Sequence, residues 1–337
     1  MIRFSDIVED INLDIEENDK ADEGLALGKT DFWNMGRVEG RNTMREARAY
    51  YQKLVTLAKQ VQAWVQNNET INISSVIQHL RHIIDNDLIE PLYYSLVFGG
   101  NKQSTVAEHS IEVTIFSLMV GIGMGYDKKR LLPLAMVALL HDVGMYKISP
   151  AILGKKGKLS EREFEQIKRH PEISAGILSK LGDKFAWLAN LSLQVHERVD
   201  GTGYPKGIKE GSVHEFAFIV GLADMYSSMI KDRPYRDRIE KNKAMKSIIS
   251  SSKSKFPAKV LKVFLNQISF FPVGTHVRLN DRSAGRVITT NPEFPLKPIV
   301  EILYDHAGNK LKKPKIVDLS QQPLLYITES IDERELI

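Results

Sequence analysis

The sequence predicts a mainly α-helical protein: a helical bundle, preceded by an N-terminal helical segment and followed by a small C-terminal β-barrel or sandwich. Two observations indicate this. Apolar residues recur at three- and four-residue steps through most of residues 41–270, which is the periodicity of buried helix faces. After residue 272 the pattern changes to short β-rich runs separated by turn residues. We therefore expect three regions, at residues 1–100, 101–270 and 271–337.

The N-terminal region begins with an acidic stretch of about 29 residues. Apolar residues alternate with polar ones in part of the segment from Ile2 to Ile15, so a short strand is one alternative there. Amphipathic helices are expected over about 41–67 and 74–85. These helices would pack against the central domain or pair two copies in a homodimer, and the sequence leaves both alternatives open.

The composition narrows the classes of function. With 337 residues, 43% of them hydrophobic and 26% charged, the chain is typical of a soluble globular protein. Its net charge of +4 is too small to indicate a nucleic-acid polymer as partner. The absence of cysteine excludes disulfides, thiolate metal sites and cysteine nucleophiles, so any metal must be held by nitrogen and oxygen. We see no apolar run long enough for a bilayer and no signal peptide, so we expect a cytoplasmic protein without membrane contact.

The central region carries a set of potential metal ligands. His141 and Asp142 end an apolar run, residues 131–140, that is typical of a buried helix. Burying an unpaired carboxylate and an imidazole is costly unless a hydrogen-bonded partner or a metal ion satisfies them. Further candidates lie in or beside apolar helical stretches: His109, His170, His196 and Asp224. Four histidines and two aspartates in comparable positions favour a metal site over a structural His-Asp pair.

Local signals set the boundaries of several other elements. Ser160 to Glu163 fits a capping box that opens a helix, and His170 directly before Pro171 is expected at a helix start. Asp200 to Pro205 must be a loop. The β-rich runs are residues 275–279, 285–289, 299–303 and 316–319.

The stretch from about Gln103 to Arg238 resembles the HD-GYP domain, a subgroup of the HD superfamily of metal-dependent phosphohydrolases. The motifs that carry the resemblance are His109-Ser110, Leu140 to Gly144, Ile152 to Lys155, Lys158 to Ser160, His170 to Glu172, His196 to Pro205, and Asp224 followed by Arg233 to Arg236. The tail from Phe271 also looks like the small barrel that follows many such domains. This family is known for hydrolysing cyclic di-GMP, and some members cleave related cyclic dinucleotides.

The resemblance implies an HD-superfamily helical bundle with two divalent metal ions, iron or manganese. By position, one ion would be held by His109, His141, Asp142 and Asp224. Asp142 would bridge to a second ion, which His170 and His196 would help to hold. The loop Gly203-Tyr204-Pro205 and the arginines Arg233 and Arg236 would face the cyclic dinucleotide, although Tyr204 packing and arginine salt bridges remain alternatives. The expected catalytic residues are Asp142, Lys147 and Tyr204.

The chain departs from the family pattern at four positions. Val195 stands where a further histidine is usual, Met145 replaces a lysine, and Ser227 replaces an aspartate. Thr105 stands where three-metal members carry a carboxylate. We expect that Lys147 supplies the missing cation, or that Met145→Lys would raise hydrolysis.

Two functions therefore compete. The first is a metal-dependent cyclic dinucleotide phosphodiesterase, favoured by the ligand set. The second is a degenerate module that binds nucleotide or a signalling partner protein with little or no turnover, favoured by Met145 and Val195. Hydrolysis of a different nucleotide is a weaker third alternative, because the Gly-Tyr-Pro loop is present.

Overall fold

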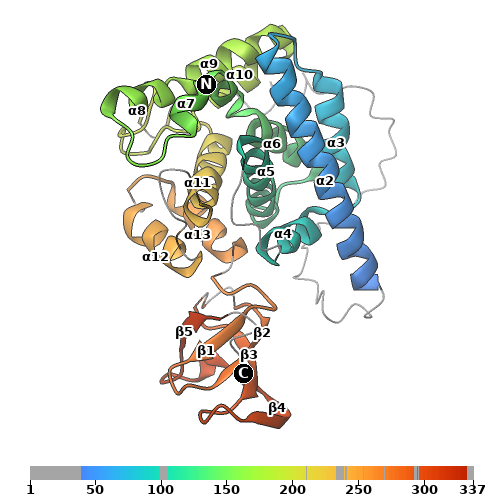
Figure 1. Cartoon of the computed structure of the whole chain (residues 1–337), viewed down its shortest axis with the longest axis vertical. Helices are drawn as coiled ribbons and strands as arrows, with labels where there is room; N and C mark the ends of the chain where they lie inside the picture. Colours follow the sequence, from blue (N-terminus) through green and yellow to red (C-terminus); the bar gives the residue numbers. More distant parts are fainter. Residues whose placement is uncertain are drawn as a thin grey trace. The chain divides into compact units, whose positions relative to one another are not determined.

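The computed structural model describes residues 39–98, 105–209, 211–232, 239, 241–252, 254–268, 270–291, 294 and 296–331. The chain divides into two compact units, residues 1–261 and 262–337, and each is described by itself. The acidic start with its predicted short strand lies outside the described residues, as do Arg233 and Arg236. Figure 1 shows the helices of the first unit and the strands of the second.

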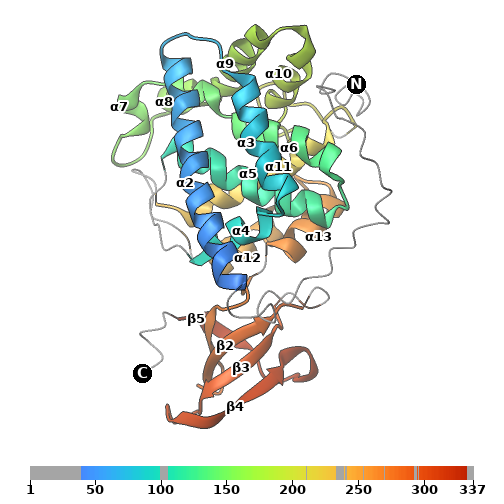
Figure 2. The ribbon, with the colours of Figure 1, turned by 90° about the vertical axis from the view of Figure 1, so that its right-hand side faces the viewer.

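Three helices open the described part of the chain: α2 (Glu39–Gln66), α3 (Ile73–Asp85) and α4 (Ile89–Phe98). The first two match the predicted helices, and α2 and α3 lie side by side (Figure 2). Asn72 caps α3 by accepting a hydrogen bond from the amide of Ser75 at 3.1 Å. The sequence analysis did not predict α4, because ten mostly apolar residues are too short to show a clear period.

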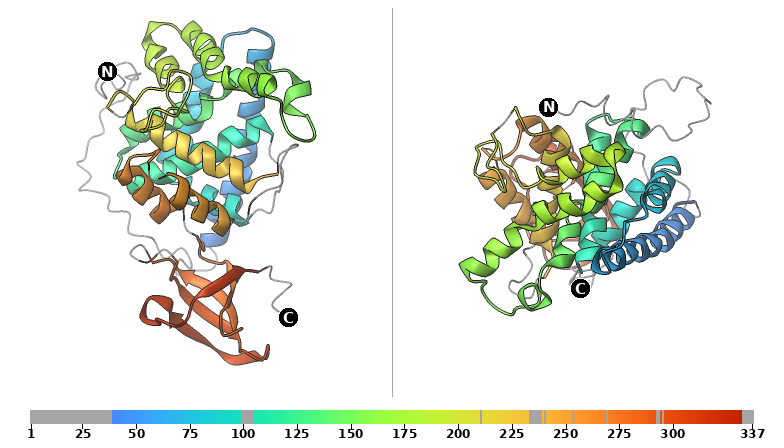
Figure 3. Two further views of the ribbon diagram at one scale, coloured as in Figure 1. Left: turned by 90° about the vertical axis from the view of Figure 1, so that its left-hand side faces the viewer. Right: turned by 90° about the horizontal axis from the view of Figure 1, so that it is seen from above.

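The core of the first unit consists of α5 (Val106–Gly123), α6 (Lys128–Leu140) and α11 (Glu215–Ile230), which contact one another. Nearly all residues of α5 and α6 are buried, so neither helix shows the polar face of a surface helix. Thr105 and Glu108 form a capping box at the start of α5. Figure 3 shows α11 crossing this core.

By length and composition alone, α5 would qualify as a membrane span, which the sequence analysis did not expect. Most of this helix is buried inside the first unit, as in the core helix of a folded domain. It also carries His109 and Glu112, two buried polar side chains. Its apolar character therefore has an explanation in the packing of the unit.

A series of short helices follows α6 and shapes the region that surrounds Asp142. These are η1 (Val143–Lys147), α7 (Pro150–Leu153), α8 (Glu161–Lys168), α9 (His170–Leu178), η2 (Ser179–Leu181), η3 (Asp183–Phe185) and α10 (Ala186–Ser192). The predicted capping box is confirmed at the start of α8, and the predicted helix start is confirmed at His170. Two further helices, α12 (Lys241–Ser252) and α13 (Ala258–Gln267), follow α11.

The second unit contains one antiparallel sheet in the order β4-β3-β2-β1-β5. Its strands are β1 (His276–Leu279), β2 (Ala284–Thr289), β3 (Ile299–Tyr304), β4 (Lys310–Asp318) and β5 (Ile327–Ser330), with the turn η4 (Leu319–Gln321) between the last two. The first three predicted runs are confirmed. The fourth, residues 316–319, matches only the last three residues of β4, and neither the first part of β4 nor the short β5 was predicted. Among the described residues the two edge strands do not pair, so the sheet is open and the barrel alternative is wrong. Exposed lysines and Pro314 on β4 discourage pairing with another chain.

Candidate metal centre

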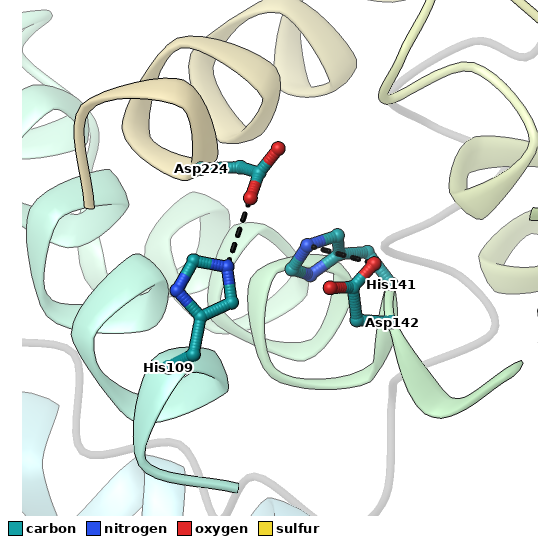
Figure 4. A group of neighbouring side chains, drawn as sticks. All are labelled: His109, His141, Asp142 and Asp224. Atoms are coloured by element: carbon teal, nitrogen blue, oxygen red, sulfur yellow. Dashed lines mark hydrogen bonds and ion pairs between the residues drawn. The ribbon is translucent and has the colours of Figure 1, made fainter. Parts of the chain in front are cut away.

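Four of the predicted ligands form one compact group (Figure 4). Nε2 of His109 lies 2.9 Å from Oδ1 of Asp224, and Nε2 of His141 lies 3.4 Å from Oδ1 of Asp142. Each of these four side chains offers one ligand atom, and these atoms all lie within 4.8 Å of one another. Such a separation allows one ion to contact all four side chains.

Asp142 belongs to a second group as well. Nε2 of His170 lies 3.0 Å from Oδ1 of Asp142, and Nε2 of His196 lies 3.8 Å from the same oxygen. The two imidazole Nε2 atoms lie 2.8 Å apart. The structure thus brings all six predicted ligands together in two groups that share Asp142, the arrangement in which one carboxylate can bridge two ions.

Six separate positions in the chain supply these side chains. They are the first turn of α5 for His109, the end of α6 for His141, the next residue for Asp142, the start of α9 for His170, the segment after α10 for His196, and the middle of α11 for Asp224. Gly144 permits the close approach of α9 to the turn after Asp142. A Cβ atom at this position would lie 2.2 Å from the carbonyl oxygen of His170, so any other residue would displace the start of α9.

Backbone carbonyls orient two of the histidine rings. Nδ1 of His141 lies 2.8 Å from the carbonyl oxygen of Ala138, and Nδ1 of His170 lies 2.7 Å from that of Ile167. A carbonyl only accepts, so both Nδ1 atoms carry a proton, and in the neutral rings both Nε2 atoms present a lone pair. Because ligand histidines in metal sites usually donate their other ring N–H in this way, the orientation suits metal binding.

The burial of the cluster also fits a cation. Nε2 of His141 and Oδ1 of Asp142 are buried, and among the described residues neither atom makes a hydrogen bond of good geometry, although Nε2 of His170 lies 3.0 Å from that oxygen. A buried acceptor without a partner costs about 1–3 kcal/mol, and more when it is charged. A divalent ion would satisfy both atoms. Nitrogen and carboxylate ligands suit manganese, iron or zinc better than magnesium.

The two carboxylates of the cluster favour their charged forms. Burial alone would raise the pKa of Asp142, but His141 and His170 outweigh burial and hold this pKa well below its usual range. Burial also opposes ionisation of Asp224, and the hydrogen bond with His109 lowers its pKa below the usual range. Both carboxylates are therefore ready to bind a cation at neutral pH.

The two histidines of the second group respond in opposite directions. Burial lowers the pKa of His196 to about 4, so its imidazole is neutral and able to ligate a metal at neutral pH. Burial also tends to lower the pKa of His170, but the adjacent Asp142 carboxylate outweighs it and raises this pKa. A proton on His170 would therefore compete with a metal ion more strongly than a proton on His196.

The Gly-Tyr-Pro loop folds back over this second group. The ring of Tyr204 stacks on the ring of His196, and the Tyr204 amide donates to the His196 carbonyl at 3.2 Å. Glu197 is buried, and its carboxylate accepts hydrogen bonds from the amides of Lys206 at 2.8 Å and Ile208 at 3.0 Å. A Cβ atom on Gly203 would lie 2.4 Å from the Cα of Glu197, so this glycine serves the close packing of the loop. Whether Gly203, Tyr204 and Pro205 bind substrate stays a prediction.

Two sequence-based expectations change with the structure. The ammonium of Lys147 is exposed and donates to the carbonyl of Gln66 at 3.2 Å and to Oδ1 of Asn68 at 2.9 Å, so it does not face the cluster. Met145 is buried in an apolar cluster with Ile148 and Ile152. A lysine at this position would enter apolar packing, so the expectation that Met145→Lys raises hydrolysis is not supported. Val195 is fully buried.

Glu112 is a further residue of the site that was not predicted from the sequence, and Ser227 was predicted only as a departure from the family pattern. The hydroxyl of Ser227 lies 3.0 Å from Nδ1 of His109 and donates to Oε2 of Glu112 at 2.8 Å. The ammonium of Lys231 lies 2.8 Å from Oε1 of Glu112. A signal was available, since Glu112 interrupts the apolar run of residues 111–115 and a charge buried there needs a partner.

Comparisons with known proteins agree with this architecture. A family model described as an HD domain matches residues 97–260, and one described as a KOW domain associated with HD domain matches residues 276–337. The cyclic di-GMP phosphodiesterase PdeB of Borreliella burgdorferi is 32% identical over 215 residues, which are 64% of this chain and 54% of that protein. The cyclic di-GMP phosphodiesterase of Thermotoga maritima is 34% identical over 179 residues, or 53% of this chain and 49% of that protein.

A third relative is named for a different substrate. The 3'3'-cGAMP-specific phosphodiesterase 3 of Vibrio cholerae serotype O1 is 33% identical over 144 residues, which are 43% of this chain and 31% of that protein. The chain spans about half the length of the Borreliella and Thermotoga relatives.

Proposed function

We propose that this chain, which contains an HD domain at residues 97–260, is a metal-dependent phosphodiesterase that hydrolyses a cyclic dinucleotide to a linear product. One observation carries the proposal: Asp142 is shared by two groups of buried ligands whose donor atoms converge. Relatives named cyclic di-GMP phosphodiesterases support cyclic di-GMP as the substrate, and a relative named for 3'3'-cGAMP makes that dinucleotide the second compound to test.

Two divalent ions, iron or manganese, fit the six ligands. When bound, such a pair neutralises a phosphodiester, lowers the pKa of a coordinated water and stabilises the leaving oxygen. The residues of the chain hold the geometry for this chemistry. Asp142 would touch both ions, the first group would hold one ion, and His170 with His196 would help to hold the other. The ring of Tyr204 stacks on one face of the His196 ring.

A second candidate function is binding of the nucleotide, or of a partner protein, without useful turnover. It is favoured by the burial of Met145 and Val195, because the structure places apolar packing where phosphodiesterases of the HD-GYP type carry a lysine and a histidine. A homodimer, a signalling partner and a cytoplasmic location stay predictions from the sequence.

One experiment distinguishes hydrolysis of a cyclic dinucleotide from binding without turnover. Protein purified without oxygen and loaded with manganese or iron is incubated with cyclic di-GMP and, separately, with 3'3'-cGAMP, and linear products are quantified by chromatography. Metal content and nucleotide binding are measured on the same sample by elemental analysis and calorimetry. Metal-dependent appearance of a linear product supports the phosphodiesterase. Binding of a dinucleotide by metal-loaded protein without any product would establish the second function instead.

A further inference from the structure

We propose that Glu112 and Ser227 are positioning residues that set the tautomer of His109, so that its Nε2 atom is the one that faces a metal ion. The inference rests on the proposed function, because it assigns these residues a task in metal binding. None of the sequence motifs described above includes Glu112, and Ser227 was noted only as a departure from the family pattern.

A continuous chain of contacts links the cluster to these residues. Nε2 of His109 lies 2.9 Å from Asp224, and Nδ1 of the same ring lies 3.0 Å from the hydroxyl of Ser227. Ser227 donates to Glu112 at 2.8 Å, and the ammonium of Lys231 lies 2.8 Å from Glu112. All four residues of this chain of contacts are buried, with exposed fractions between 0% for Ser227 and 8% for Lys231. Water therefore does not compete for these bonds.

The direction of each bond follows from the number of protons available. Glu112 pairs with the ammonium of Lys231, so its carboxylate only accepts. Ser227 has one hydroxyl proton and donates it to Glu112. The oxygen of Ser227 must then accept from His109, which places the ring proton on Nδ1 and leaves the lone pair on Nε2. In this tautomer a cation between Nε2 and the Asp224 carboxylate, whose Oδ1 lies 2.9 Å from Nε2, satisfies both groups.

Helix spacing brings the participants together. His109 and Glu112 are three residues apart on α5, so they lie on one face of that helix. Asp224 and Ser227 are three residues apart on α11, which packs against α5, and Lys231 follows directly after the last residue of α11 in an extended backbone conformation. The same helix pair thus supplies two metal ligands and the groups that orient one of them. Such outer partners change metal affinity by about 10–100-fold when they are removed.

The test compares two buried serines. Ser227→Ala removes the hydroxyl that contacts His109, whereas Ser117→Ala removes a fully buried hydroxyl on α5 that has no partner among the described residues. Manganese affinity is measured by calorimetry on metal-free protein. We expect Ser227→Ala to weaken binding about 10–100-fold and Ser117→Ala to stay within about twofold. Equal losses in both variants, or a change below about twofold in Ser227→Ala, would overturn the proposal.

A second variant tests the origin of the effect. Glu112→Gln keeps the shape but offers an amide, which can turn the Ser227 hydroxyl toward His109 and favour the wrong tautomer. We expect a similar loss of affinity, and the double variant should lose no more than about the stronger single variant, because both changes break one chain. Losses that multiply in the double variant would contradict a single chain of contacts.

Nitrogen NMR of the histidine rings in metal-free protein separates this inference from the proposed function. His109 should carry its proton on Nδ1 in the wild type and lose this preference in Ser227→Ala. If the wild type binds no manganese, the proposed metal site fails, while the ring tautomer still decides whether Glu112 and Ser227 orient His109. A wild-type ring that carries no proton on Nδ1 would overturn the positioning role.

Discussion

The ring of Tyr204 stacks on the ring of His196, with centroids 4.9 Å apart and planes inclined by 3°. His196 is a predicted ligand. Nδ1 of His141 and Nδ1 of His170 each contact a backbone carbonyl, whereas no such contact is described for Nδ1 of His196. Its Nδ1 lies 3.7 Å from Asp224. The stack with Tyr204 and the 2.8 Å contact between Nε2 of His196 and that of His170 together restrain the orientation of this ring.

Removing this stack should loosen the second group. We expect Tyr204→Ala to weaken metal binding at the side of His170 and His196 by about 2–10-fold, because an aromatic pair contributes about 0.5–1.5 kcal/mol. Tyr204→Phe keeps the ring and should change this affinity by less than about twofold. Titration of metal-free protein with manganese measures both. An equal loss in the two variants would show that the hydroxyl, and not the stack, matters.

Asp142→Ala should abolish both metal binding and hydrolysis, since this carboxylate is shared by both groups of ligands. We expect metal affinity to fall by more than about 100-fold, beyond the usual effect of removing an outer partner. Asp183→Ala, at an exposed aspartate in η3, is the control and should keep both properties. Retention of two ions per chain in Asp142→Ala, by elemental analysis, would contradict the bridging role.

Met145→Lys should destabilise the protein and should not raise hydrolysis. The new ammonium would enter the apolar cluster of Met145, Ile148 and Ile152, where burial of an unpaired charge is unfavourable. We expect a loss of about 1–3 kcal/mol in the free energy of unfolding, measured in urea. Met145→Leu preserves the packing and serves as the control. Faster turnover in Met145→Lys would show that the lysine reaches the metal site.

The raised pKa of His170 predicts how the metal-free protein responds to pH. A raised folded-state pKa stabilises the protein fully below the ordinary value of 6.5, and this contribution disappears as the pH rises through the folded-state pKa. The advantage of the wild type over His170→Gln should therefore shrink as the pH rises above about 6.5. Below this pH His196, with its pKa lowered to about 4, makes stability increase with pH.

The measurement is the urea midpoint of both proteins in the presence of a chelator. With manganese the wild type should show the opposite trend, because the metal binds the neutral imidazole and competes with protons less at high pH. A chelated wild type whose advantage over His170→Gln grows above pH ~6.5 would show that the Asp142 carboxylate does not hold a proton on His170.

Deletion of residues from 271 onward should leave the metal content of the chain unchanged. All six predicted ligands lie between His109 and Asp224, within the first compact unit. A lower stability of the shortened protein would not contradict this prediction, because the prediction concerns metal content alone. Elemental analysis of the soluble shortened protein provides the readout, and loss of metal would mean that the C-terminal unit contributes to the site.

Several elements followed from local sequence alone. The capping box at Ser160, the helix start at His170 and the periodic helices α2 and α3 depend on neighbouring residues, and the structure confirms them. The resemblance to the HD domain is also confirmed, by the family model over residues 97–260. The short elements α4 and β5 were missed, because runs of ten and four residues do not display a readable period.

The pattern of residue types indicates which side chains form the candidate site, because buried histidines and aspartates on apolar helices need a common partner. Where the accessory side chains point depends on how the helices pack against one another. Met145 and Lys147 follow Asp142 at positions that suggested proximity to the cluster, yet one packs into an apolar cluster and the other reaches the end of α2. Ser227 contacts His109 only because α11 packs on α5, a contact between residues 118 positions apart that no local pattern encodes.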